Sequence, residues 1–222
     1  MEIPLFPLPN LVLFPQVAVP LHIFEDRYKL MINRCIDKEE VFGLVLLRAG
    51  AEEELESTIH RVGVTSRVVE VDRLQDGRMN ILSAGEMRFR ILRFIGKLPY
   101  WTASVELFED ENEPSDLLHT AYEEVAGLYK QSMDLMAQLR SSESSDLSLP
   151  ESPVALSYVV SYVLDLDSEK KQQLLETTST LDRLQSLSAY LQENLKQLQL
   201  QIARKDVASK VRGNGDLGVP GN

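Results

Sequence analysis

The side chains that could do chemistry in this chain of 222 residues are three histidines, one cysteine and a run of glutamates. A metal or general-base site favours histidines at a short spacing such as H-x-x-x-H, which places two ring nitrogens on one helix face. His22, His60 and His119 fall on separate expected elements and show no such spacing. We therefore expect three ordinary surface or strand histidines and no metal site.

The cysteine and the glutamates also have ordinary structural interpretations. A reactive thiolate needs a neighbour that lowers its pKa, but Cys35 lies on the apolar stripe of an expected helix, which predicts a buried thiol. A single cysteine also excludes an internal disulfide. Glu52, Glu53, Glu54 and Glu56 could supply paired carboxylates for acid–base catalysis, but a run of this kind usually forms a solvated loop.

The sequence contains no phosphate-binding loop. Such a loop needs the pattern G-x-x-x-x-G-K-[ST], in which glycine amides and a lysine hold the phosphates. The only Gly-Lys pair is Gly96-Lys97, which is followed by Leu98. We therefore expect no ATP hydrolysis, no cofactor and no catalytic residue, and we predict that the chain is not an enzyme.

Charge and hydropathy limit the classes of partner. The net charge is −11 and the pI is about 4.8, so the chain repels phosphate backbones and anionic lipids. Neither nucleic acid nor a membrane is an expected partner. Prolines interrupt the apolar amino-terminal runs, and no stretch of about 18 apolar residues follows, which argues against a signal peptide or a membrane span. We expect a cytoplasmic protein.

The elements that must position these residues differ between the two halves of the chain. Residues 25–38 predict one helix, because Tyr28, Met31, Ile32 and Cys35 recur at helical spacing. Asp76-Gly77 predicts a hairpin turn. Short apolar or alternating segments predict strands at Leu11–Phe14, Val17–Ile23, Phe42–Leu47, Arg61–Asp72, Met79–Leu82, 87–92 and 102–107.

Everything after residue 112 is expected to be helical. Ser115 can cap a first helix, and Ser152-Pro153 is typical of a helix start. A short helix is expected at Ser168–Glu176, and a long one opens at Thr180. The long helix carries an apolar stripe at Leu181, Leu184, Leu187, Leu191, Leu195, Leu198 and Ile202. We expect a β-rich domain over residues 1–112, a helical subdomain over 113–210 and a disordered tail over 211–222.

Several motifs together resemble one protein family. They are Leu8-Pro9-Asn10-Leu11-Val12-Leu13-Phe14-Pro15, Val19-Pro20-Leu21, His60-Arg61-Val62-Gly63-Val64, Asp76-Gly77 with Gly85-x-x-Arg88-Phe89-Arg90-Ile91, Lys171-Gln172-x-Leu174-Leu175-Glu176, and Leu181-Asp182-Arg183-Leu184. In order and spacing they resemble the amino-terminal, substrate-binding domain of Lon proteases, across roughly Ile3–Lys205. No single motif is decisive, but together they are specific.

The resemblance implies an α+β fold: an amino-terminal β-rich, PUA-like pseudobarrel with one packed helix, followed by an all-helical subdomain ending in a long helix. In Lon enzymes this region precedes an ATPase module and a serine–lysine protease, neither of which this sequence contains. The resemblance therefore predicts a free-standing, non-catalytic module that binds unfolded or damaged polypeptides. Such a module would act in protein quality control, as an adaptor beside a protease or a chaperone.

A binder of unfolded chains needs an exposed apolar patch or an open strand edge. The candidates for polypeptide binding are Phe6, Leu8, Phe14, Ile23, Phe24, Tyr100 and Trp101. Each of them, taken singly, could instead fill the core.

Two other functions stay open at this stage. The leucine stripe of the last helix could drive homodimerisation of a structural interaction protein. PUA-like folds can also bind RNA, and seven arginines lie in the first half: Arg61, Arg67, Arg73, Arg78, Arg88, Arg90 and Arg93. No aromatic pattern interleaves them, which disfavours RNA binding.

Overall fold

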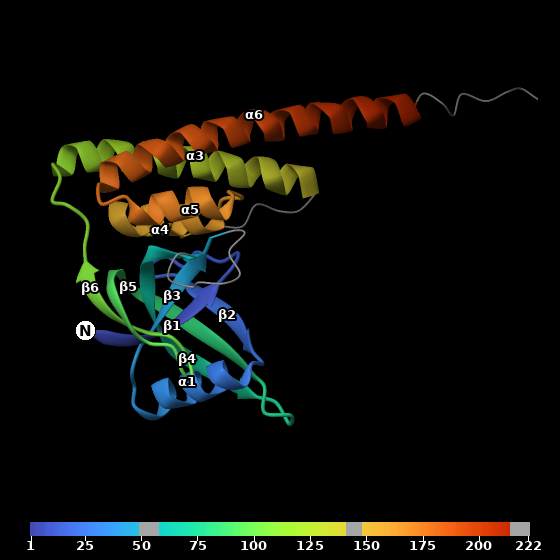
Figure 1. The fold of residues 1–222 in the computed structure, drawn as a ribbon. Helices are drawn as coiled ribbons and strands as arrows, with labels where there is room; N and C mark the ends of the chain where they lie inside the picture. The colour runs from blue at the N-terminus through green and yellow to red at the C-terminus, as the bar shows by residue number, and fades with distance from the viewer. Residues whose placement is uncertain (49–57, 141–147, 214–222) are drawn as a thin grey trace, which may run out of the picture.

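The computed structural model describes residues 1–48, 58–140 and 148–213, with side chains up to residue 205. A β-rich half lies beneath a layer of helices, and helix α1 closes the end of the β half that faces away from that layer (Figure 1). The β half contains β1 (Glu2–Leu8), β2 (Ala18–Ile23), α1 (Asp26–Asp37), β3 (Phe42–Leu47), β4 (Ile59–Arg73), β5 (Met79–Gly96) and β6 (Thr102–Phe108). The helical layer contains α3 (Ser115–Arg140), α4 (Pro153–Val163), α5 (Ser168–Glu176) and α6 (Thr180–Gly213).

The strands form one mixed sheet that closes on itself. Their order is β2-β5-β4-β3-β1-β6, and β6 also pairs with β5. Five strands therefore form a ring, and β2 is attached to it through β5. Only β1 and β3 pair in parallel; the other pairings are antiparallel. Six strands and the five helices of the described residues confirm the expected α+β class.

Glycine is required at one point where the paired strands β3 and β4 approach closely. A Cβ atom added to Gly63 would lie 2.3 Å from the carbonyl oxygen of Leu44 and 2.8 Å from the ring of Phe89. A backbone oxygen cannot move aside as a side chain could, so only glycine fits. The core around Gly63 is one of two apolar clusters. The other, larger cluster continues from the ring into the helical layer.

One predicted strand, at residues 11–14, is absent from the structure, and one observed strand was not predicted. Residues 11–14 form a loop, in which Phe14 is buried and its carbonyl accepts from the Val17 amide. Strand β1 was not predicted at all. It contains Pro4 and Pro7, but it pairs with β6 over its first residues and with β3 over its last, so each part has one unpaired side. A proline's missing N–H is tolerated on such a side.

The other elements agree closely with their predictions. Phe42–Leu47 and Ser168–Glu176 have the expected bounds, and the expected strands at 79–82 and 87–92 are parts of one long strand, β5. The Ser152 hydroxyl accepts from the Ala155 amide and so caps α4. The acidic run at 52–56 and the tail after residue 213 lie outside the described residues.

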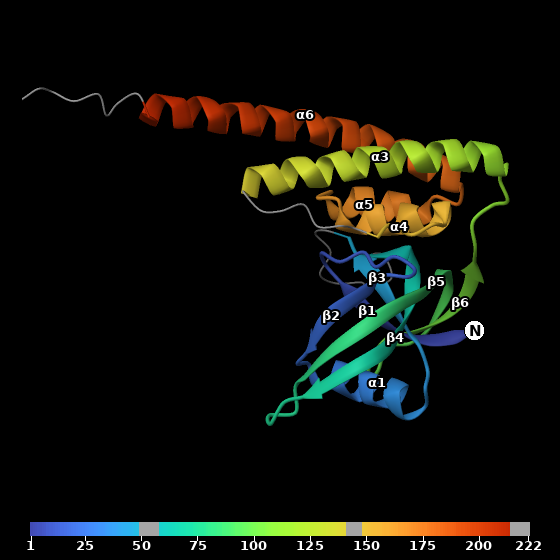
Figure 2. The same ribbon diagram turned by 180° about the vertical axis from the view of Figure 1, so that it is seen from behind.

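The long last helix packs within the chain. The stripe residues Leu184, Leu187 and Leu191 are fully buried, and α6 lies along α3 in both ribbon views (Figures 1 and 2). No helix of the described segments is long and apolar enough to cross a membrane. We propose that the chain divides into a β-rich domain and a helical subdomain near residue 112, because β6 ends at Phe108 and α3 begins at Ser115.

Candidate functional site

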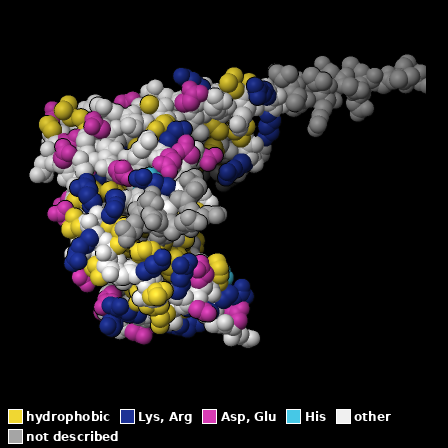
Figure 3. Space-filling model, viewed as in Figure 1, with side chains coloured by type: hydrophobic (Ala, Val, Ile, Leu, Met, Phe, Trp, Pro, Cys, Tyr) yellow, Lys and Arg dark blue, Asp and Glu magenta, His cyan; other side chains and the backbone are white. Residues whose placement is uncertain are grey.

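An apolar groove of about 400 Å³ opens on the surface of the β half. Its walls come from the end of β1, the end of β2, the first turn of α1, the end of β3 and the residue before β6. The lining residues are Phe6, Pro7, Leu8, Pro9, His22, Ile23, Phe24, Glu25, Arg27, Tyr28, Leu47 and Trp101. Figure 3 shows hydrophobic side chains reaching the surface of the β half among Lys and Arg side chains.

Buried aromatic rings form the floor of the groove, and exposed ones form its rim. Phe6 is buried and its ring lies 4.3 Å from that of Tyr28, centroid to centroid. Phe24 is 60% exposed and stacks on His22 at 6.0 Å. Trp101 is half-buried and meets the ring of Phe94 edge-on at 5.5 Å. A ligand entering the groove would therefore contact apolar surface on several sides.

The charged residues of the groove neutralise each other. Arg27 donates to Glu25 from Nε at 2.8 Å and pairs with it through Nη2 at 2.7 Å. The guanidinium also lies 4.5 Å from the centre of the Tyr28 ring. Burial raises the pKa of Tyr28 above its ordinary value, as expected for a phenol on a floor of low polarity. The groove therefore presents apolar surface without a net charge from this pair.

The structure brings together five of the seven candidate binding residues. Phe6, Leu8, Ile23, Phe24 and Trp101 line the groove. The other two lie elsewhere: Phe14 is buried with its ring 6.2 Å from that of Tyr158, and the Tyr100 hydroxyl accepts from Arg34 Nη1 at 3.3 Å.

The sequence reasoning missed several lining residues. Among them, Tyr28 carried a usable signal, because it is the first apolar position of the α1 stripe and follows directly on Phe24 and Arg27. His22 had none, since its place at the rim depends on how β2 pairs.

Two of the histidines have polar partners, His119 is exposed on α3, and the cysteine is buried. His22 Nδ1 lies 2.7 Å from Asn80 Oδ1, and the ring of His60 lies between Glu169 and Glu176. Over the described residues, no cluster of three His, Cys, Asp or Glu side chains could hold a metal ion. Burial raises the pKa of the Cys35 thiol to about 11, so the thiolate is disfavoured.

A buried cluster of charged side chains lies at the junction of the two halves. Arg88 from β5 and Arg183 from α6 are completely buried, and both pair with Asp110, which is 7% exposed. Arg88 also donates to the carbonyls of Leu175 and Thr177, and Arg183 donates to Thr177 as well. We call Arg88, Asp110 and Arg183 the junction triad.

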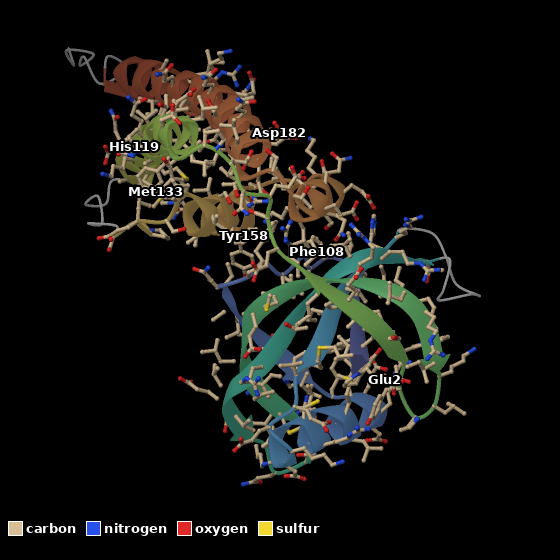
Figure 4. All side chains as sticks on the ribbon, turned by 90° about the vertical axis from the view of Figure 1, so that its left-hand side faces the viewer. Glu2, Phe108, His119, Met133, Tyr158 and Asp182 are labelled. Carbon is tan, nitrogen blue, oxygen red and sulfur yellow. The ribbon has the colours of Figure 1, made fainter. Side chains whose placement is uncertain are left out.

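Aromatic rings enclose the junction triad. The guanidinium of Arg183 lies 4.4 Å from the ring centre of Tyr158, and that of Arg88 lies 4.5 Å from that of Phe108. Tyr158 and Phe108 lie where the helical layer meets the β half (Figure 4). Because the arginines already bind a carboxylate, carbonyls and rings, the triad fixes the two halves to each other.

Three of the other arginines in the β half have polar side-chain partners. Arg67 pairs with Glu86, Arg78 pairs with Asp76, and Arg73 donates to Asn33. Arg88 is buried, and the guanidinium groups of Arg61 and Arg90 lie over the rings of Phe94 and Phe108.

The comparisons with known proteins agree over nearly the whole chain. The family model of the ATP-dependent protease La (LON) substrate-binding domain matches residues 2–193. The Lon protease of Dictyoglomus thermophilum is 23% identical over 198 residues, which cover 89% of this chain and 25% of that protein. Lon protease 2 of Herpetosiphon aurantiacus is 28% identical over 202 residues, covering 90% and 25% respectively. The chain thus spans about a quarter of the length of these relatives.

Two solved structures share the fold. The Lon N-terminal domain protein from Xanthomonas campestris superposes with a TM-score of 0.59 at 22% identity, over 85% of this chain and 98% of that one. The N-terminal domain of the Mycobacterium avium complex Lon protease gives a TM-score of 0.62 at 18% identity, over 86% and 98%.

Proposed function

The chain belongs to the family of LON substrate-binding domains, and from this premise we propose that it binds unfolded or damaged polypeptides through the apolar groove without catalysing a reaction. The observation that supports this proposal is the groove itself, which is lined by Phe6, Leu8, Ile23, Phe24 and Trp101. Phe24 is exposed at its rim, and Leu8 and Trp101 are half-buried. Folded proteins bury their large apolar side chains, whereas unfolded chains expose them. An apolar groove therefore distinguishes the two states.

The neutral lining fits such a ligand. Because Arg27 and Glu25 pair with each other, the groove has no unpaired charge there that would favour acidic or basic segments. Recognition then depends on apolar side chains of many kinds rather than on one sequence. In this proposal the protein is a cytoplasmic adaptor that passes bound polypeptide to a protease or a chaperone.

Trp101 provides a direct test, because it is the only tryptophan in the chain and lines the groove. We would titrate the protein with a permanently unfolded, tryptophan-free protein and follow the emission of Trp101. The anisotropy of a label on the ligand gives the affinity in parallel. The native, folded protein from which that ligand is prepared is the control. We expect a spectral change and binding with the unfolded form alone.

A matched pair of variants locates the binding surface. Phe24→Ser removes an exposed aromatic ring from the groove rim, and Leu200→Ser removes an apolar side chain that is 52% exposed on α6. We expect weaker binding for Phe24→Ser and unchanged binding for Leu200→Ser. Equal losses, or no binding of the unfolded protein by the unaltered chain, would contradict the proposal.

A further inference from the structure

Strand β2 has one unpaired edge. Within the described part of the chain, β2 pairs with β5 and with no other strand, although the other five close a ring. In both ribbon views β2 lies at the outer side of the β half (Figures 1 and 2). An unpaired edge presents backbone N–H and C=O groups that can bind another extended chain.

The hydrogen-bond alternation shows which groups point away from β5. The Gly85 amide donates to the Val17 carbonyl at 2.8 Å, and the register from Ala18↔Ala84 to Ile23↔Met79 continues this pairing without a shift. In an antiparallel pair, every second residue exchanges hydrogen bonds with its partner. The backbone N–H and C=O groups of Val19, Leu21 and Ile23 therefore point toward β5. The backbone groups of Ala18, Pro20 and His22 point away from it.

The position of Pro20 agrees with this assignment. Proline has no N–H, so within a sheet it is tolerated where that group would face away from the neighbouring strand. Pro20 occupies such an outward position, and β2 loses no hydrogen bond to β5. The free edge consequently offers the N–H groups of Ala18 and His22 and three carbonyls.

The edge and the groove meet at the end of β2. His22 and Ile23 are the last residues of the strand, and both line the groove, together with the adjoining Phe24. A chain paired with His22 would run beside the groove. Because side chains alternate between the two faces of a strand, every second side chain of that ligand would point toward the groove.

We propose that the ligand is an extended polypeptide segment that adds to β2 as an extra strand and places alternate apolar side chains in the groove. This inference rests on the proposed function and specifies its ligand class. Backbone pairing is independent of sequence, so it supplies affinity for many unfolded segments, and the groove selects the apolar ones. Ala18 and His22 each offer both a donor and an acceptor, whereas Pro20 offers only an acceptor, so the pairing weakens there.

The test uses short, labelled peptides that alternate leucine with threonine and carry one N-methyl group at successive positions. N-methylation removes a backbone donor and leaves the side chain in place. We expect affinity losses of about three- to tenfold at every second position and small losses between them, since a hydrogen bond contributes about this much. Losses without this alternation would show binding by side chains alone; they would overturn strand addition and leave the proposed function intact.

A variant of the protein tests the same inference from the other side. Pro20→Val adds an outward N–H to β2 without changing the residues that face β5. We expect tighter binding of the unmethylated peptide by about three- to tenfold, with Pro150→Val, in a loop of the helical half, as the control for replacing a proline. Unchanged affinity in Pro20→Val would also overturn strand addition. If no peptide binds the unaltered protein, both the inference and the proposed function fail.

Discussion

The groove and the junction triad are built from segments equally far apart in the chain, but their chemistry is opposite. The groove is apolar, and Phe24 at its rim is 60% exposed. The triad consists of charged side chains, and its two arginines are fully buried. A buried charge is tolerated only when it is paired and hydrogen-bonded, whereas an exposed apolar ring is tolerated anywhere but contributes little to stability.

This difference assigns the two regions to two tasks. The triad joins β5, the segment after β6 and α6, so it holds the helical layer on the β half. Arg88 and Arg183 belong to the motifs that carry the family resemblance, yet both are buried at the junction. Phe24 and Trp101 lie outside those motifs and line the groove. Substitutions should therefore separate stability from binding.

Asp110→Ala should have the largest effect. It leaves two guanidinium groups buried without a carboxylate, which typically costs about 3–5 kcal/mol of the free energy of unfolding. Urea unfolding followed by circular dichroism measures this loss. The control is Asp76→Ala, which breaks an exposed ion pair with Arg78 in the hairpin turn and should change stability little. Equal losses in the two variants would mean that the triad does not hold the helical layer on the β half.

Phe24→Ser should weaken polypeptide binding and leave the stability of the protein almost unchanged. We expect its affinity for an unfolded protein to fall about tenfold, which corresponds to about 1.4 kcal/mol. Its free energy of unfolding should change by less than about 0.5 kcal/mol, because the side chain is mostly exposed. Anisotropy and urea unfolding on the same preparation measure both quantities. A loss of stability that matches the loss of affinity would remove the distinction between groove and junction.

The core behind the groove should respond to alkaline pH. Burial raises the pKa of Cys35 on α1 to about 11, from 9.0 without burial. The unfolded chain therefore releases this proton first as the pH rises. The stability that the neutral thiol contributes is present below pH 9 and is lost between pH 9 and 11, at up to about 1.4 kcal/mol per pH unit. Urea unfolding at pH 8 and 10 should show the loss, and Cys35→Ala should reduce it.

The sequence predicted most elements and part of the groove, for identifiable reasons. Helical periodicity located α1 because its stripe from Tyr28 to Cys35 is regular, and apolar runs located β3. Pro4 and Pro7 concealed β1, because a single sequence does not show which side of a strand is unpaired. The same limit applied to the candidate residues: Phe14 and Phe24 are both phenylalanines beside a strand, but only tertiary packing makes one buried and the other exposed.

The junction triad could not be predicted from the sequence, because it also depends on tertiary packing. Arg88 and Arg183 were visible as motif residues, but Asp110 lies in an acidic linker with Glu109, Glu111 and Glu113. Nothing in the residue types distinguishes the one carboxylate that is buried between the arginines from its more exposed neighbours. Its role depends on the approach of α6 to β5, which is a tertiary contact.

Salt should have the smallest effect on binding. Its effect tests whether charged side chains of the groove contribute to the affinity. Arg27 and Glu25 already pair with each other, so binding an apolar segment neither forms nor breaks an ion pair there. We expect the affinity for an unfolded, uncharged polypeptide to change less than about twofold between roughly 50 and 500 mM salt. An RNA ligand held by arginines would instead lose affinity steeply over this range. Anisotropy titrations at several salt concentrations, with single-stranded RNA as the comparison ligand, distinguish the two. A steep salt dependence with polypeptide would mean that Arg27 and Glu25, rather than the apolar lining, supply the affinity.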